Sequence, residues 1–422
     1  MQSATTPRDI HTFAESDAFD VARIRADFPV LEMTVNGKPL VYLDNAATSQ
    51  KPLAVADRMY RYMVRENSTV RRGVHYLSER STYEFDRARK RVADFVGAED
   101  PREIVFVRGT TEAINLVASG FEHAFLKEGD EVLLSELEHH ANIVPWQLAC
   151  ERTGAKIRVI PMNYAGELEL EHLDELITPR TKIVGVTHVS NALGTVNPIR
   201  QIVDAAHAKG VPVLVDGAQG VPHMDVDIRE LGCDFYAFSA HKMFGPTGIG
   251  VLYGTTEWLE KLPPYQGGGD MILSVTFEKT VFNTIPHKFE AGTPAIVEAI
   301  GLAATIDYLE SVGLDKIAAH EHDLLDYATE RVGAIEGVTI FGTAREKASV
   351  LSFVVEGIHS HDVGTILDQE GIAVRVGHHC AQPVMQFYKV PATARASFAL
   401  YNTRDEVDAL ARGVEKCIEV FG

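Results

Sequence analysis

The chain contains 422 residues, of which 45% are hydrophobic and 23% are charged, and its formal charge is −19. A chain of this length exceeds what one small core accommodates, so we expect two domains. The strong negative charge argues against partners that are themselves anionic, so we expect no nucleic-acid role and no role at a membrane surface.

The first half of the chain predicts alternating strands and helices. Residues 1–20 are polar and lack the basic start and apolar stretch of a signal peptide, and a short amphipathic helix is expected from Val21. Apolar runs then predict strands at 104–107, 131–134, 157–160, 183–186, 213–215 and 235–238, and helical spacing occurs at 112–118 and 199–209. This alternation is typical of parallel strands joined by helical crossovers, with helices on both faces of the sheet.

The second half predicts a smaller α+β domain. The glycine- and proline-rich stretch 262–270 interrupts the alternation, and we expect it to be a functional loop. Beyond it the sequence predicts strands at 338–340 and 350–355, and helices at 296–312, 317–333, 361–370 and from Arg404. We expect a partly mobile N-terminal segment packing near the small domain (1–30), a large domain (31–293) and a small C-terminal domain (294–422).

Polar side chains follow four of the predicted strands. In open parallel sheets, ligands bind beyond the carboxyl ends of the strands, so these side chains should meet at one edge. The residues that follow the four strands are His139, Asn191, Asp216 with Gln219, and Ser239 with His241 and Lys242. Their convergence is a stronger indication of a site than any one of them.

A lysine at one strand end and a carboxylate at another are what an enzyme needs to hold pyridoxal 5'-phosphate. Lys242 would form the Schiff base, and Asp216 would keep the ring nitrogen protonated. Each residue also has an ordinary interpretation: a solvated surface lysine, and a helix-capping aspartate. His139 could be a structural histidine, could stack on a planar ring, or could move protons.

A phosphate site is predicted where a helix begins after Gly109. Backbone N–H groups at a helix start bind anions, and Thr111 lies in this first turn. Ser239 and His241 would add side-chain donors. Thr110 could be an ordinary N-cap, and the two roles can coexist.

Cys380 lies in a glycine-containing loop beside two histidines and near Arg375. A free cysteine is often a small buried hydrophobe, but positive neighbours favour a nucleophilic thiolate, which is the interpretation we prefer.

The chain has four cysteines and no CxxC pair, which indicates a reducing, cytoplasmic setting and no metal site. Arg395 could be a surface arginine or the clamp for a substrate carboxylate.

Taken together, these residues resemble the SUF-type cysteine desulfurases of the class V aminotransferase family. The segments that carry the resemblance are Tyr42-Leu-Asp-Asn-Ala-Ala-Thr, the run from Glu138 to Trp146, Asp216-Gly-Ala-Gln219, Ser239-Ala-His-Lys242, Phe289-Glu-Ala-Gly-Thr-Pro and Arg375-Val-Gly-His-His-Cys380. The resemblance implies a fold-type I pyridoxal-phosphate-dependent transferase, with a mostly parallel seven-stranded sheet in the large domain and a smaller α+β C-terminal domain. It also implies a homodimer with the active site at the subunit interface.

The resemblance also implies roles for individual residues. Lys242 would hold the cofactor, His139 would stack on its ring, Asp216 would face the ring nitrogen and Gln219 the ring oxygen. Phosphate would be held by Thr111, Ser239 and His241, joined by Thr293 of the partner subunit. Substrate carboxylate would be held by Arg395 and by Asn191, which also contacts the cofactor, with Arg375 nearby, and Cys380 would take the sulfur.

The implied reaction converts L-cysteine to L-alanine and leaves a persulfide on Cys380, for iron–sulfur cluster assembly. A selenocysteine lyase and a catalytically inactive scaffold subunit are the alternatives. His361 matches a position that relatives with a zinc-dependent SufU-type sulfur acceptor use, so this acceptor is slightly favoured over a SufE-type one. Arg71 replaces the usual histidine of the family, and there we expect a changed interface contact rather than lost activity.

Overall fold

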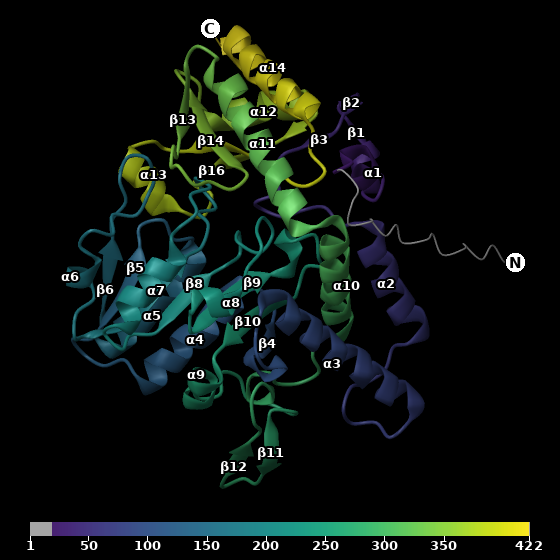
Figure 1. The fold of residues 1–422 in the computed structure, drawn as a ribbon, viewed down its shortest axis with the longest axis vertical. Coiled ribbons are helices and arrows are strands. Elements are labelled where there is room, and N and C mark those ends of the chain that lie inside the picture. Colours follow the sequence, from purple (N-terminus) through teal and green to yellow (C-terminus); the bar gives the residue numbers. More distant parts are fainter. Residues whose placement is uncertain (1–18, 422) are drawn as a thin grey trace, which may run out of the picture.

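A seven-stranded sheet forms the centre of the larger part of the computed structural model, which describes residues 19–421 (Figure 1). Its order is β4 (Ile104–Val107), β10 (Gly250–Gly254), β9 (Phe235–Ser239), β8 (Val213–Asp216), β7 (Thr181–Thr187), β5 (Glu131–Ser135) and β6 (Lys156–Ile160). Strand β10 runs antiparallel to both neighbours, and the other pairs are parallel. The prediction of a mostly parallel seven-stranded sheet is confirmed.

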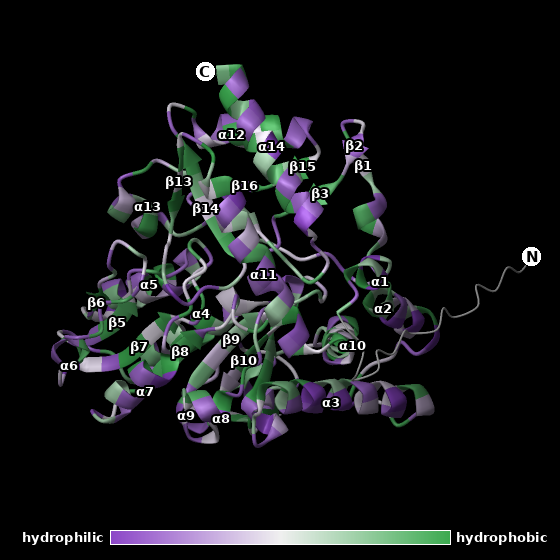
Figure 2. Cartoon of the chain, turned by 45° about the horizontal axis from the view of Figure 1, so that its top comes forward, coloured by the Kyte–Doolittle hydropathy of each residue, from purple (hydrophilic) through white to green (hydrophobic). Residues whose placement is uncertain are grey.

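Helices cover both faces of this sheet, because neighbouring strand residues point to opposite sides. Leu133 and Val184 pack with α3 (Tyr76–Val96), α7 (Ile199–His207) and α10 (Ile296–Val312). On the other face, Leu134 and Ile183 pack with α4 (Thr110–Ala124), α5 (Val144–Thr153) and α9 (Thr256–Lys261). Figure 2 shows the strands largely green and the outward faces of helices such as α3 purple. Continuous apolar strands are what such double coverage requires.

A smaller antiparallel sheet lies above the first in Figure 1, in the order β13 (Val338–Phe341), β14 (Val350–Val355), β17 (Thr393–Ser397) and β16 (Arg375–Gly377). Its apolar core is shared with α11 (Leu314–Gly333), α12 (Ser360–Gln369) and α14 (Arg404–Phe421). The short strand β15 (Ile372–Ala373) pairs in parallel with β3 (Val41–Tyr42), so residues before the large sheet also join this part. The domain boundaries at 31 and 294 stay a prediction, and the expectation for residues 1–18 lies outside the described residues.

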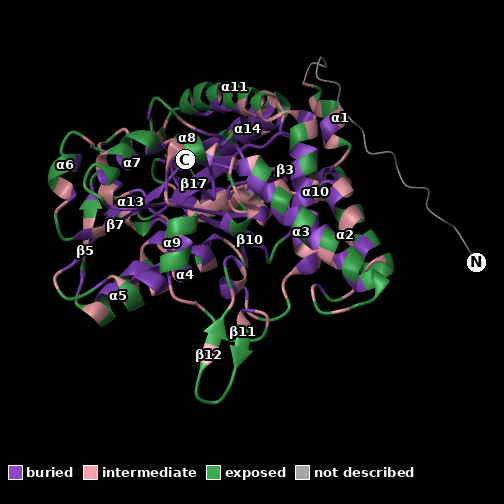
Figure 3. Cartoon of the chain, turned by 60° about the horizontal axis from the view of Figure 1, so that its bottom comes forward, coloured by how far each residue is buried: buried purple, intermediate pink, exposed green. Residues whose placement is uncertain are grey.

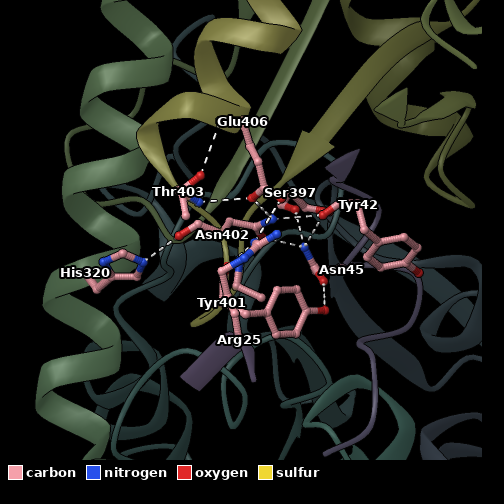
Figure 4. A network of polar contacts seen from close by, with 10 residues as sticks. Arg25, Tyr42, Asn45, His320, Ser397, Tyr401, Asn402, Thr403 and Glu406 are labelled. Carbon is pink, nitrogen blue, oxygen red and sulfur yellow. Dashed lines mark hydrogen bonds and ion pairs between the residues drawn. The ribbon is translucent and has the colours of Figure 1, made fainter. Parts of the chain in front are cut away.

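A buried polar network ties residues 42–50, which we call the strap, to the small sheet (Figure 4). Asn45 Nδ2 donates to the carbonyl of Ser397 (2.6 Å) and to Asn402 Oδ1 (3.1 Å). Asn402 Nδ2 in turn donates to the carbonyl of Tyr42 (3.0 Å). In α1 (Val21–Arg25), Arg25 donates to the backbone at Tyr401 (2.6 Å) and pairs with Glu406 (2.9 Å). The strap is thereby fixed against the loop that follows β17.

Several elements were not predicted, and their sequences explain why. Strand β10 contains glycines, and one of them is required there: a Cβ on Gly250 would lie 2.5 Å from Gly109 Cα. Strand β17 is fully buried although its sequence is Thr-Ala-Arg-Ala-Ser, in which the only apolar residues are two alanines. The other α-helices and strands that were not predicted are α3, α5, α9, β3, β15 and β16, whose bounds are given above, and β1 (Thr34–Val35), β2 (Lys38–Pro39), β11 (Ile272–Val275), β12 (Thr280–Phe282), α2 (Leu53–Arg65), α6 (Leu173–Leu176), α8 (Ile228–Leu231) and α13 (Gln382–Tyr388).

The hairpin β11–β12 projects from the body with its residues exposed (Figure 3). Leu273, Val275 and Phe277 are large apolar side chains on this exposed hairpin. Within residues 19–421, no helix combines the length and the apolar character that a membrane span needs.

Candidate active site

One cavity of about 220 Å³ lies at the carboxyl ends of the large sheet's strands and is closed by residues of the small sheet. Most of the predicted site residues border it: Thr111, His139, Asn191, Asp216, Gln219, Ser239, His241, Lys242, Arg375, Cys380 and Arg395. Thr111 lies in the first turn of α4. The next seven residues lie at the ends of β5, β7, β8 and β9 or in the segments that follow them, and the last three come from β16, β17 and the segment between them. The edge-of-sheet prediction therefore places these residues correctly.

Burial in this cavity shifts the pKa values of Lys242 and Asp216 in opposite directions. Burial lowers the pKa of Lys242, partly opposed by the nearby Asp216 carboxylate. Burial also raises the pKa of Asp216, opposed by Lys242, and its Oδ1 accepts the N–H of Ala218 (3.0 Å). A lowered lysine pKa increases the fraction of free amine, the form that attacks an aldehyde or accepts a proton.

Hydroxyl groups and a helix start meet at one end of the cavity. The backbone N–H and the hydroxyl of Thr110 both lie 2.8 Å from Ser239 Oγ. The carbonyl of His241 accepts hydrogen bonds from Ser49 N (3.1 Å) and Thr48 Oγ1 (3.0 Å) of the strap, and from Lys51 Nζ (3.0 Å) directly after it. The residue before Lys242 is thus held in place from a distant part of the chain. The hydroxyl groups of Thr110 and Ser239, which lie together at the start of α4, suit a phosphate group.

His139 is held as a neutral imidazole. Burial, followed by the charge of Lys242, lowers the pKa of His139 to about 3. Its Nδ1 accepts the N–H of Ala141 (3.0 Å), which leaves the proton on Nε2. A neutral ring fixed at its backbone side is suited to stack on a cofactor and to donate a hydrogen bond from Nε2.

Arg395 is 1% exposed and spans the two parts of the cavity. Its guanidinium contacts Asp44 Oδ1 (3.1 Å) and donates to the carbonyl of Asn191 (2.8 Å). Its Nε has no hydrogen-bond partner among residues 19–421. Burial, opposed first by Asp44, lowers the pKa of Arg395 to about 10, so it stays charged at neutral pH. A buried cation with donor capacity to spare can bind a carboxylate.

Cys380 is partly buried and unpaired. His379 and Cys380 both adopt left-handed backbone conformations, with φ of 53° and 56°. Asn191 Nδ2 donates to the His379 carbonyl (2.5 Å), so in this structure the Asn191 amide contacts the cysteine loop. The loop therefore holds the thiol at the cavity in a conformation that its contacts must maintain.

Three residues singled out in the sequence lie outside this cavity. Thr293 is exposed and does not border the cavity of its own chain. The His361 side chain is 75% exposed at the start of α12. Arg71 lies in a left-handed conformation (φ 64°) and pairs with Asp86 (3.3 Å).

Sequence reasoning missed several cavity residues. Ala46 and Ala47 of the strap and His379 also border the cavity, and Asp44 supports Arg395. All of them stand inside segments that the sequence marked, but nothing in the sequence separates them from their neighbours. His379 illustrates the difficulty, since its Nε2 bonds to Thr393 Oγ1 (2.7 Å) across 14 positions.

The family model for class V aminotransferases matches residues 41–410. The chain belongs to the class V aminotransferase family. Its curated relatives include a probable cysteine desulfurase of Halalkalibacterium halodurans, which is 52% identical over 94% of the chain and 98% of the relative. A probable cysteine desulfurase of Mycolicibacterium paratuberculosis is 53% identical over 96% of the chain, and the chain spans only 59% of that relative.

Solved structures agree with this family membership. The S-sulfonic acid form of the cysteine desulfurase CsdA from Escherichia coli superposes with a TM-score of 0.90 at 39% identity. The match covers 96% of this chain and all of that one. The fold is therefore that of pyridoxal-phosphate-dependent class V enzymes.

The cavity residues fit pyridoxal 5'-phosphate, the cofactor of this family. Gln219 is 2% exposed, and its Oε1 has no hydrogen-bond partner among the described residues, so it is available to a polar group of a ligand. Lys242 would hold the aldehyde, Asp216 the ring nitrogen, and the Thr111 and Ser239 end the phosphate.

Proposed function

We propose that the chain is a cysteine desulfurase that converts L-cysteine to L-alanine and transfers the sulfur to Cys380. The observation that carries the proposal is the presence of a free cysteine thiol and the buried Lys242 on one cavity. A class V transaminase or lyase needs the lysine but has no use for the thiol. The names of the relatives support the same reaction.

Substrate binding follows from the charges at the cavity. Arg395 would bind the cysteine carboxylate, since its guanidinium has an unpartnered Nε and Arg375 adds a second positive charge. The backbone carbonyl of Asn191 accepts a hydrogen bond from the same arginine. The side-chain amide of Asn191, a residue that borders the cavity, would orient the bound carboxylate. Bound pyridoxal phosphate would supply an aldehyde for the cysteine amine and a ring that withdraws electrons from Cα.

Lys242 and Asp216 perform the proton steps. The free amine of Lys242 would accept the Cα proton, and Asp216 would keep a proton on the ring nitrogen. The Cys380 thiolate would then attack the substrate sulfur: an S–S bond forms, the Cβ–S bond breaks, and its electron pair stays on Cβ. Two protons must then return: Lys242 would give the proton that it accepted back to Cα, and the proton released when the Cys380 thiol ionises would go to Cβ, which gives alanine. Cysteine and the Cys380 thiol become alanine and a persulfide, which balances atoms and electrons.

The proposal is tested by incubating the purified protein with L-cysteine and measuring alanine. We expect catalytic alanine release from the wild-type chain, whereas Lys242→Ala should release none and should lose the Schiff-base absorbance. Parallel assays with selenocysteine separate the lyase alternative by relative rate. Absence of cofactor absorbance from the wild-type protein would support an inactive scaffold instead.

The chain is further proposed to act as a homodimer. Thr293 is exposed outside its own cavity, and large apolar side chains such as Val74, Tyr76 and Phe277 are exposed on the same chain. Burial of these side chains by a second copy would bring Thr293 of the partner subunit to the phosphate. The four cysteines are unpaired, which supports a reducing cytoplasm as the site of action.

A sulfur-acceptor protein is the final part of this proposal, with a role in iron–sulfur cluster assembly. The exposed His361 is free to reach a zinc ion on a SufU-type acceptor. We expect His361→Ala to abolish stimulation by a zinc-containing acceptor while leaving the unstimulated rate unchanged. Equal stimulation of His361→Ala and wild type by that acceptor would show that His361 takes no part in the transfer.

A further inference from the structure

The turn that carries Cys380 adopts a conformation that it would not hold alone. His379 and Cys380 are consecutive non-glycine residues with positive φ, which is uncommon and costs conformational energy. The position of the thiol therefore depends on contacts that other segments of the same chain make with this turn. Those contacts identify which residues place the nucleophile.

His140 contacts this turn at two points. Its backbone N–H donates to the carbonyl of Cys380 (2.7 Å), and its Nε2 accepts the backbone N–H of Gln382 (3.1 Å). His140 does not border the cavity, although its neighbour His139 does. One residue thus connects the cysteine turn to the segment that presents His139 to the cavity.

The Gln382 N–H would otherwise lack a partner, because it is the first donor of helix α13. The N-cap residue Ala381 has no side-chain acceptor, and Pro383 has no N–H of its own. The His140 imidazole therefore takes the place of a capping side chain. Burial, followed by the proximity of His378, lowers the pKa of His140, which favours the neutral ring that this bond requires.

We propose that His140 is a positioning residue for Cys380, and that it fixes the thiol-bearing turn relative to the cofactor-facing His139. This inference deepens the proposed function, because it concerns the residue that would accept sulfur. It makes a specific claim: the imidazole acts as a hydrogen-bond acceptor, so a side chain that keeps an acceptor should replace it.

The test compares His140→Leu, which removes the acceptor, with His140→Gln, which keeps one. His378→Leu is the matched control, since His378 is an exposed histidine two residues before Cys380. Hydrogen–deuterium exchange of the peptide spanning 381–388 reports the Gln382 N–H, and iodoacetamide reports exposure of the Cys380 thiol. Cofactor absorbance reports whether the cavity is intact.

We expect His140→Leu to speed both exchange and alkylation about fivefold, the factor for losing one net hydrogen bond, with cofactor absorbance unchanged. His140→Gln and His378→Leu should match the wild type. Wild-type rates in His140→Leu, or equal impairment of His140→Gln, would overturn the proposal.

A second variant covers the case in which His140→Leu does not fold. Gln382→Pro removes the donor at a helix position where proline is tolerated, and should speed alkylation in the same way; an unchanged rate there contradicts the proposal. These readouts do not depend on turnover. Full alanine production by Cys380→Ala would contradict the proposed desulfurase reaction. The exchange and alkylation rates of the His140 variants would still decide whether His140 positions the turn.

Discussion

Arg395 combines near-complete burial with a single carboxylate contact among the described residues, that to Asp44. Burial disfavours the charge of Arg395, and the Asp44 carboxylate offsets only part of this cost. A second anion, such as a substrate carboxylate, would therefore be stabilised beside it. The same burial lowers the pKa of Lys242 and raises the pKa of Asp216. The protonation states of these three side chains thus follow from their burial at the edge of the sheet.

Arg395→Lys should therefore weaken substrate binding. Lysine keeps the charge but loses the planar fork that matches a carboxylate, so we expect the KM for cysteine to rise by roughly tenfold. Cofactor absorbance should remain, because Lys242 is unchanged. The control is Arg345→Lys, at a side chain that is 90% exposed. An unchanged KM in Arg395→Lys would show that another group binds the carboxylate.

At this scale the sequence predicted the residues that stand directly after apolar strands, such as Lys242 and Asp216. Their placement needs only the rule that strand ends share one edge. Asp44 and His140 could not be predicted in the same way. Their partners, Arg395 and Cys380, lie far along the chain, and the contacts arise only when the two sheets come together.

Among the elements, α3 is attached to the large sheet by a buried ion pair. Arg89 donates to the carbonyl of Ile104 (2.6 Å) and to Glu290 (2.7 Å), and Glu290 accepts the N–H of Phe106 (2.9 Å). Burial alone would raise the pKa of Glu290, but Arg89 and the other donors lower it to about 2. Three separate elements therefore depend on one carboxylate.

This pair predicts an acid-dependent loss of stability. Because the folded pKa of Glu290 lies below its ordinary value of 4.5, its contribution is complete above that value and is lost as the pH falls towards about 2. Urea unfolding of the wild type should show this decline, and Glu290→Gln should flatten it. An equally steep decline in Glu290→Gln would assign the acid sensitivity to other groups.

Breaking the pair from the other side should be more damaging. Arg89→Ala leaves a buried carboxylate without its cation, which costs about 3–5 kcal/mol in the free energy of unfolding. The neighbouring pair Lys90–Asp94 is exposed, so Lys90→Ala should cost about 0–1 kcal/mol. Similar losses in the two variants would contradict the claim that burial gives the Arg89 pair its weight.

Elements with a long apolar run, such as α10, or with amphipathic spacing, such as α12, were predicted within a few residues. Strand β17 was not predicted, because the apolar residues of its alternating pattern are only alanines, between a threonine, an arginine and a serine that are also buried. Strand β10 was not predicted, because it begins and ends with glycine, and Gly250 is required by its close approach to the start of α4. Tertiary packing overrode local sequence in both cases.

At the scale of the whole molecule, the exposed apolar side chains predict a dimer. Light scattering of the purified protein should give twice the mass of one chain. Val74→Asp combined with Phe277→Asp should shift it towards the monomer, since both side chains are more than nine-tenths exposed in the single chain. Tyr164→Asp is a control at another exposed aromatic residue. A monomeric wild type would remove the proposed role of Thr293.

The closure of the cavity is also a property of the whole molecule. The segments at the large sheet's edge supply Lys242 and Asp216, and the small sheet supplies Arg395. The strap is bonded to the small sheet, as Figure 4 shows, and also to the carbonyl of His241 beside Lys242. The sequence indicated both groups of residues, but the resemblance to a known family was needed to join them. Periodicity alone does not say how two sheets face each other.

The central claim is that Cys380 receives the sulfur of cysteine. It is tested most directly by mixing the cofactor-loaded protein with one equivalent of L-cysteine, blocking thiols, and locating the persulfide by peptide mass spectrometry. We predict one added sulfur atom on Cys380, one alanine released per persulfide, and no added sulfur on Cys150, Cys233 or Cys417. Persulfide on another cysteine, or undiminished alanine production by Cys380→Ala, would contradict the account.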